Sequence, residues 1–223
     1  MSRQIMRIFC GHYGSGKTNI SVNAVLAYKK EHPDEQVTLL DMDIVNPYFR
    51  ASDNEQDIIQ AGIRPISPLY AGSNVDIPAL TSAVYSAFED DYAVFDVGGD
   101  DSGATVLGVY ADYFNKTKYT MQMVINASRP LIASPQQLMI LKDSIETVSR
   151  LNITGLINNT NLGDETTKDI LLDGFAYGDE VSRYLNLPLD MSTVTENFQG
   201  DFSPEEIEKY KIYFIQNITK KLF

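Results

Sequence analysis

The chain has 223 residues, a length that favours one domain or at most two small ones. Its hydrophobic residues, 43% of the total, are spread along the whole length and exclude intrinsic disorder. With 18 Lys and Arg against 30 Asp and Glu, the formal charge is −12, the wrong sign for coating nucleic acid or an anionic membrane. There is no run of about 18 apolar residues, and because the first residues soon meet Gly and a charge, we expect no signal peptide. We expect one domain over residues 1–223 that is cytoplasmic and binds neither nucleic acid nor membrane.

Short apolar segments alternate with helical ones along the chain. Residues 4–10 (QIMRIFC) are β-prone and end at a Gly-rich turn, and residues 17–31 show helical periodicity. Further strands are expected at 37–41, 92–96, 120–126 and 153–158, and further helices at 76–90, 103–115, 136–150, 167–185 and 203–221. The alternation predicts an α/β fold: a three-layer sandwich whose mostly parallel, twisted sheet is covered by helices on both faces.

Residues 11–18 (GHYGSGKT) match the motif G-x-x-x-x-G-K-[ST] at every fixed position, between a predicted strand and a predicted helix. The glycines let successive N–H groups point at phosphate oxygens, and the helix dipole adds positive potential there. Lys17 is expected to reach the β- and γ-phosphates, and the Thr18 hydroxyl to ligate Mg²⁺. The other predicted nucleotide contacts in and after this loop are Gly11, His12, Tyr13, Gly14, Ser15, Gly16 and Asn19.

Acidic residues follow two of the predicted strands. Asp41 and Asp43 close the second strand, and Asp96 closes another in the segment VFDVGGD. Gly99 would allow close approach to a γ-phosphate. We expect these acids to position a metal ion and a water molecule beside the phosphate loop, although each Asp is also a common turn residue.

Taken together, residues 11–18, the D-x-D pair at 41–43 and the loop at 96–99 resemble the MinD/ParA/CobQ-type branch of P-loop NTPases. Four segments are further similar to bacterial ATP-binding proteins of that branch with a D-x-D-I-V-N-P-Y-F-R motif: 41–53, 96–104, 126–130 and 155–167. The resemblance covers nearly the whole chain. It implies that Asp43 orients the attacking water, that Asp96 is the Mg²⁺-linked residue of switch II, and that Asp41 is an outer-shell partner of the metal.

The phosphate loop departs from that family at one position. Many members carry a second lysine after the first glycine of the loop, which reaches the partner's phosphates in a nucleotide sandwich dimer. This chain has His12 there, and a neutral imidazole does not replace a fixed cation. A monomer and a nucleotide-dependent homodimer both stay open. Arg50 and Arg129 follow strand ends and are candidates for the missing charge, or are ordinary surface arginines.

Adenine is the preferred base. A guanine-specific site normally uses an Asn/Thr-Lys-x-Asp loop, and the near match at residues 115–118 (NKTK) lacks the acid. Asn158 and Asn159 resemble the family's base-contacting position, and an amide both donates and accepts hydrogen bonds. The alternative is that one of them caps its loop.

Two other features of the sequence concern the possible cofactors and the fold of the last residues. Cys10 is the single cysteine and is expected to be buried; relatives that bridge an iron–sulfur cluster or nickel need two per protomer. Ser203 opens a capping box with Pro204 and Glu206, which predicts a helix over 204–221 that packs on the sheet.

The sequence thus predicts a protein that binds ATP and Mg²⁺, hydrolyses the ATP slowly to ADP, and acts as a switch on an unidentified client protein. One alternative is an ATP-dependent ligase or kinase for a small carboxylate. For that reaction the Pro/Gly/Ser-rich loop at 62–78, a candidate mobile flap with Arg64 and Tyr70, would form the acceptor pocket. The other alternative is a regulatory module that binds nucleotide without turning it over.

Overall fold

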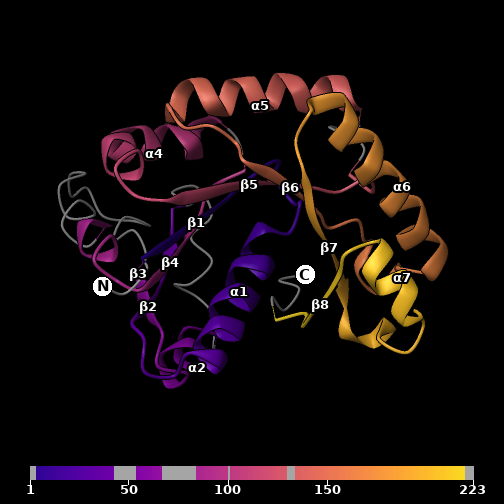
Figure 1. The fold of residues 1–223 in the computed structure, drawn as a ribbon, viewed down its shortest axis with the longest axis horizontal. Coiled ribbons are helices and arrows are strands. Elements are labelled where there is room, and N and C mark those ends of the chain that lie inside the picture. The colour runs from indigo at the N-terminus through magenta and orange to yellow at the C-terminus, as the bar shows by residue number, and fades with distance from the viewer. Residues whose placement is uncertain (1–3, 43–53, 67–83, 100, 130–133, 219–223) are drawn as a thin grey trace.

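A computed structural model describes residues 4–42, 54–66, 84–99, 101–129 and 134–218 (Figure 1). In this part of the chain eight strands form one sheet, in the order β3-β2-β4-β1-β5-β6-β7-β8, and each pair of neighbours is parallel. The strands are β1 (Ile5–Cys10), β2 (Val37–Asp41), β3 (Arg64–Ile66), β4 (Tyr92–Asp96), β5 (Tyr119–Ile125), β6 (Gly155–Asn158), β7 (Leu189–Thr195) and β8 (Ile212–Ile215).

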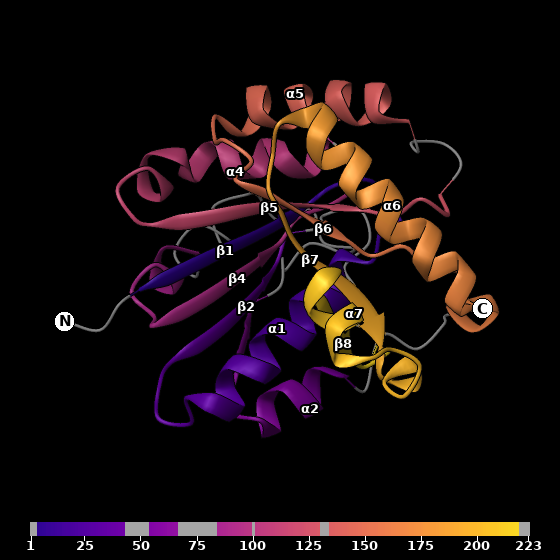
Figure 2. The same ribbon diagram turned by 45° about the vertical axis from the view of Figure 1, so that its right-hand side comes forward.

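Helices cover both faces of the sheet (Figures 1 and 2). The helices are α1 (Lys17–Glu31), α2 (Asn54–Gln60), α4 (Asp101–Phe114), α5 (Pro135–Ser149), α6 (Lys168–Leu185) and α7 (Pro204–Lys209), with single 3₁₀ turns at Gly163–Glu165 and Glu196–Phe198. Helices α1 and α2 lie on one face, and α4, α5 and α6 lie on the other. The predicted α/β sandwich is confirmed.

The apolar core is divided by the sheet into two main clusters. In β1, Met6 and Ile8 point into the cluster beneath α4 and α5, whereas Phe9 points into the cluster beneath α1. This alternation follows from the two-residue period of a strand, and burial on both faces explains why β1 reads as a nearly continuous apolar run. A smaller third cluster joins α6, α7, β7 and β8 around Phe175 and Phe202.

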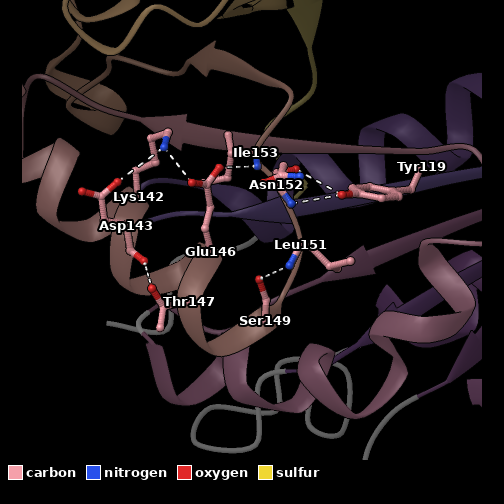
Figure 3. Close-up of polar contacts among 9 residues, drawn as sticks. All are labelled: Tyr119, Lys142, Asp143, Glu146, Thr147, Ser149, Leu151, Asn152 and Ile153. Carbon is pink, nitrogen blue, oxygen red and sulfur yellow. Dashed lines mark hydrogen bonds and ion pairs between the residues drawn. The ribbon is translucent and has the colours of Figure 1, made fainter.

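Polar contacts fix the turn between α5 and β6 (Figure 3). The Glu146 carboxylate accepts a hydrogen bond from the backbone N–H of Ile153 at 2.8 Å and also binds Lys142 at 2.7 Å. The backbone N–H of Asn152 donates to the Tyr119 hydroxyl at 3.0 Å. These contacts hold the start of β6 against β5, and so they set where the polar residues at the end of β6 emerge.

The helix predicted over 203–221 is wrong in its second half. The capping box at Ser203 is present and α7 starts at Pro204, but the helix ends at Lys209. Lys211 then adopts a left-handed conformation with φ 51°, and Ile212–Ile215 form β8 beside β7. The residues IYFI are β-branched and aromatic, which favours a strand, and their apolar side chains fill the core clusters from the sheet edge.

Three other elements were not predicted: α2, β3 and β7. β3 lies inside the stretch 62–78 that was expected to be a loop, and residues 67–78 are outside the described part of the chain. Arg64 of β3 forms an ion pair with Asp90 at 2.6 Å and donates to the Thr38 hydroxyl at 2.9 Å. These contacts hold the edge strand, and Arg64 also lines a surface pocket of about 390 Å³, so its role at an acceptor site stays a prediction. In the described residues, no helix combines the length and apolar composition of a membrane span.

Candidate nucleotide-binding site

The phosphate loop connects the end of β1 to the start of α1, as predicted. Three loop residues have left-handed backbone angles that favour glycine: Gly11 (φ 128°), Gly14 (φ 74°) and Gly16 (φ 95°). Gly16 is also the N-cap of α1, so no side chain caps the amide end of the helix. The exposed N–H groups and the helix dipole meet at this point, which is the arrangement that binds phosphate in proteins.

The loop is closed by its own polar groups. The backbone N–H of Ser15 donates to the His12 carbonyl at 3.1 Å, and Lys17 Nζ donates to the same oxygen at 3.0 Å. Lys17 is only 7% exposed. Within the described residues, the buried Ser15 Oγ and His12 Nδ1 have no hydrogen-bond partner. The Lys17 ammonium and the Ser15 hydroxyl are donors within this loop, which fits a bound anion.

Asn159, at the end of β6, supports the phosphate loop from beneath. Its Nδ2 donates to the Ser15 carbonyl at 2.7 Å, and its Oδ1 accepts from the Thr193 hydroxyl at 2.7 Å. A Cβ atom on Gly16 would collide with the Asn159 amide, so the close approach requires glycine. Asn159 thereby connects β7 to the loop.

Asn158 caps its own loop. Its Oδ1 accepts from the Thr160 hydroxyl at 2.7 Å, and its Nδ2 donates to Ser192 Oγ at 3.3 Å. Asn158 and Asn159 are 2% and 6% exposed. Both amides are thus engaged with protein groups, which agrees with the alternative of a loop-capping role; a contact with the base stays a prediction.

The predicted metal-binding acids Asp41 and Asp96 both lie at the carboxyl ends of the strands, as the phosphate loop does. Asp41 and Asp96 end neighbouring strands β2 and β4 and stand directly opposite each other in the register. Each is 2% exposed, and β4 in turn pairs with β1, the strand that carries the phosphate loop. Thr18 lies in the first turn of α1. Asp43 and Arg50 are outside the described residues.

This oxygen donor set fits Mg²⁺. Proteins commonly hold Mg²⁺ with one or two carboxylates, and substrate phosphates and water complete its coordination. The part of the chain that the structure describes contains no group of three or more His, Cys, Asp or Glu side chains arranged around a metal site. A metal held by Asp96 and Thr18, with Asp41 in its outer shell, would therefore take its remaining ligands from a bound phosphate and water.

Gly99, in the loop after β4, packs against the phosphate loop itself. A Cβ atom added to Gly99 would lie 2.6 Å from Tyr13 Cα and 2.8 Å from Tyr13 N. Two loops that are both expected to contact the γ-phosphate are thus in direct backbone contact. A shift in either loop must move the other.

Burial and, to a smaller extent, the neighbouring Lys17 and Arg129 cations lower the pKa of His12 below its ordinary value. Arg129 Nε donates to the Gly14 carbonyl at 2.9 Å, so its guanidinium lies on the phosphate loop. Cys10 is buried, as predicted, and burial raises the pKa of its thiol to about 12.

A pocket of about 430 Å³ extends from the phosphate loop past the ends of β6 and β7. Its lining includes Gly14, Gly16 and Asn19 of the phosphate loop and α1, and Asn161, Asp164 and Asn197 of the segments that follow β6 and β7. By contrast, residues 115–118 precede β5 and so lie at the amino ends of the parallel strands, whereas the phosphate loop lies at their carboxyl ends. The near match to a guanine-specific loop is therefore far from the site.

Sequence reasoning missed Asp164 as a pocket residue. Asn161 and Asp164 have the spacing of the Asn-Lys-x-Asp loop, with Leu162 in place of lysine, and they follow a strand of the sheet. From that spacing, Asp164 could have been predicted as a residue of the nucleotide pocket. Asn197 and Asn217 carried no signal, because β7 and β8 had not been predicted.

No protein-family model matches the sequence, and no curated protein sequence matches it. Solved structures do match the fold. The FtsY protein of Mycoplasma mycoides is similar over 86% of this chain and 61% of its own, with 20% identity and a TM-score of 0.56. The cell division protein FtsY of Thermotoga maritima is similar over 86% of this chain and 62% of its own, with 20% identity and a TM-score of 0.57.

The signal recognition particle 54 kDa protein of Aeropyrum pernix, solved in complex with GDP, is similar over 86% of this chain and 41% of its own, with 17% identity and a TM-score of 0.55. The chain thus spans less than two thirds of the length of these proteins. It has the α/β fold of P-loop NTPases, with a phosphate loop between the first strand and the first helix.

Proposed function

We propose that the chain binds the Mg²⁺ complex of a nucleoside triphosphate in its phosphate loop and hydrolyses it slowly. The observation that carries this proposal is the juxtaposition of the loop at residues 11–18 with the paired carboxylates Asp41 and Asp96. A phosphate cradle beside two buried acids combines an anion site with a cation site, which suits a metal-bound triphosphate.

Each residue has a stated role in this proposal. Lys17 and the loop amides stabilise negative charge that develops on the β–γ bridge and the γ-phosphate. Thr18 and Asp96 hold Mg²⁺, which neutralises charge on the phosphate oxygens when bound, and Asp41 acts from its outer shell. Asp43 orients the attacking water, as the resemblance to the MinD/ParA/CobQ branch implies.

ATP is the proposed substrate. The complete guanine-specific loop is absent from the sequence, and residues 115–118 are remote from the pocket. Asp164 is the observation that favours GTP, because a carboxylate accepts well from the two N–H donors of a guanine edge. An adenine amino group would also donate to Asp164. Direct comparison of the two nucleotides distinguishes these cases.

The hydrolysis cycle is proposed to switch a partner protein. Gly99 and Tyr13 are in contact, so a change at the γ-phosphate would pass from the phosphate loop to the start of α4. Arg129 is the proposed source of the positive charge that the family's second lysine provides, since it already lies on the loop. With the charge supplied within one chain, a monomer would be competent for hydrolysis, and a nucleotide-dependent homodimer would not be required.

The test is phosphate release from Mg·ATP and Mg·GTP by the purified chain, with equilibrium binding measured in parallel. Lys17→Ala should abolish both binding and release, which also controls for contaminating enzymes. Asp43→Ala should keep binding and lose release. Wild-type levels of release in Lys17→Ala would contradict the proposal, and undiminished release in Asp43→Ala would contradict the role of that residue. Tight binding without release would favour a regulatory module.

A further inference from the structure

A short C-terminal segment, residues 216–218, lies along the first half of α1; we refer to it as the C-terminal strap. Asn19 Nδ2 donates to the Gln216 carbonyl at 3.0 Å, and Asn19 Oδ1 accepts from the Ile218 N–H at 2.9 Å. Asn23 Nδ2 donates to the same Gln216 carbonyl at 2.9 Å, and Asn23 Oδ1 accepts from the Gln216 N–H at 2.9 Å. Two side chains thus bind three backbone groups of the strap.

The spacing of the two asparagines explains this arrangement. Residues four apart on a helix lie one above the other on the same face, and each amide carries both a donor and an acceptor. Asn19 and Asn23 therefore hydrogen-bond to the backbone that follows β8 through a donor and an acceptor each, as a neighbouring strand would. These contacts do not depend on the side chains of the strap. The Ile218 side chain packs on the core cluster beneath α1, and the exposed Asn217 lines the pocket.

The strap forms part of the nucleotide pocket. Asn19 immediately follows Thr18, and both Asn19 and Asn217 line the pocket of about 430 Å³. The phosphate loop lines part of this pocket, so a bound triphosphate directs its sugar and base toward the remaining lining residues. Among these, Asn197 and Asn217 carry amides and Asp164 carries a carboxylate. The Asn161 amide is bound within its own loop, to the Asn159 carbonyl and the Gly163 N–H.

We propose that Asn217 contacts the nucleoside part of the bound nucleotide, and that Asn19 and Asn23 are positioning residues that hold the C-terminal strap in place for this contact. The assignment rests on the proposed function. It gives Asn19 a role different from a phosphate contact: its side-chain amide binds the strap. It also makes residues 216–218 part of the nucleotide site.

The test compares ligands with and without a nucleoside. Binding of Mg·ATP, Mg·GTP and Mg·tripolyphosphate is measured for the wild type, Asn217→Ala, Asn23→Ala and the control Asn115→Ala, whose exposed side chain precedes β5 at the amino ends of the strands. Asn217→Ala and Asn23→Ala should weaken nucleotide binding about five- to tenfold, the value of one lost hydrogen bond, and leave tripolyphosphate binding unchanged. Asn115→Ala should match the wild type.

Hydrogen exchange gives a second measurement that does not depend on affinity. Saturating Mg·ATP should slow exchange at the Gln216 and Ile218 amides of the wild type, and saturating tripolyphosphate should not. Equal weakening of nucleotide and tripolyphosphate, unchanged nucleotide binding in both variants, or no slowing with ATP would each overturn the proposal. A wild-type chain that binds neither nucleotide would instead contradict the proposed function itself.

Discussion

Asn159 shows how much of the site depends on a single side chain beneath the phosphate loop. Its amide satisfies the Ser15 carbonyl above it and the Thr193 hydroxyl below it, so one residue connects the loop to β7. The sequence places Asn159 at a strand end, and from this an edge-of-sheet position could be predicted. Its bonding partners could not, because they lie 144 and 34 residues away along the chain.

Replacing Asn159 with Ala should lower the free energy of unfolding by about 1–3 kcal/mol, because the buried Ser15 carbonyl loses its donor and the Thr193 hydroxyl keeps only its 3.3 Å contact with the Asn158 carbonyl. Nucleotide binding should weaken as well, since the loop loses its support. Equilibrium denaturation and nucleotide titration measure the two effects, with Asn115→Ala as the exposed control. A variant with wild-type stability and affinity would show that the loop does not depend on this amide.

His12 gives the site a dependence on pH. Its pKa is lowered in the folded chain, so the unfolded chain takes up the proton first as pH falls. The stability contributed by the neutral imidazole is therefore present above the ordinary pKa and is lost below it. A bound phosphate would raise this pKa again, so binding takes up a proton and becomes tighter as the pH falls from 7.5 to 6.

We expect the ratio of wild-type to His12→Gln nucleotide affinity to rise as the pH falls from 7.5 to 6. NMR titration of the His12 imidazole, with and without nucleotide, measures the change in its pKa that should account for this rise. Comparison with His12→Gln removes the titration of the nucleotide's own phosphate. A ratio that is constant between pH 7.5 and 6 would exclude coupling between His12 and the phosphate.

At the scale of elements, the predictable parts are those with a strong local pattern. β1, α1, β2, β4 and β5 have apolar runs or helical periodicity bounded by turn residues, and all were predicted to within a few residues. β7 (LDMSTVT) has polar residues buried by contact with the end of β6, such as Ser192 and Thr193, so its burial has no hydrophobic signature. β8 was not predicted because the capping box at Ser203 correctly indicates the start of a helix but does not indicate where that helix ends.

The contact between the loop after β4 and the phosphate loop gives a prediction at this scale. Gly99→Ala should weaken nucleotide binding by roughly 5- to 150-fold, because its Cβ would force Tyr13 and the phosphate loop to move, and overpacking of this kind costs about 1–3 kcal/mol. Gly200→Ala is the matched control, since a Cβ at Gly200 meets no atom within 4 Å. Titration of both variants with Mg·ATP measures the difference, and equal affinities would refute the coupling of the two loops.

At the scale of the whole molecule, the site draws on residues from nearly the entire described chain, from the loop after β1 to the strap after β8. Binding should therefore stabilise the chain as one unit. At a nucleotide concentration 100 times Kd, the stabilisation is about 2.7 kcal/mol. For a chain of this size that corresponds to a rise in Tm of roughly 5–11 °C.

Calorimetry with and without Mg·ATP should show one transition that moves upward as a whole, and no movement for Lys17→Ala. Two separate transitions, only one of which responds to nucleotide, would contradict the expectation of a single domain over residues 1–223.

The strand order also has a consequence for the synthesis of this protein. β1 is made first, but its neighbours in the sheet are β4 and β5, so Phe9 pairs with Asp96 on one side and Gln122 on the other. At ribosomal rates of about 5–20 residues per second, the nascent β1 waits roughly 6–23 seconds for residue 125 to be added. Its apolar run lacks both sheet partners until residue 96 completes β4, after roughly 4–17 seconds, and lacks β5 for the rest of the interval. Chaperone dependence in cells should therefore be greatest while the first half of the chain is emerging.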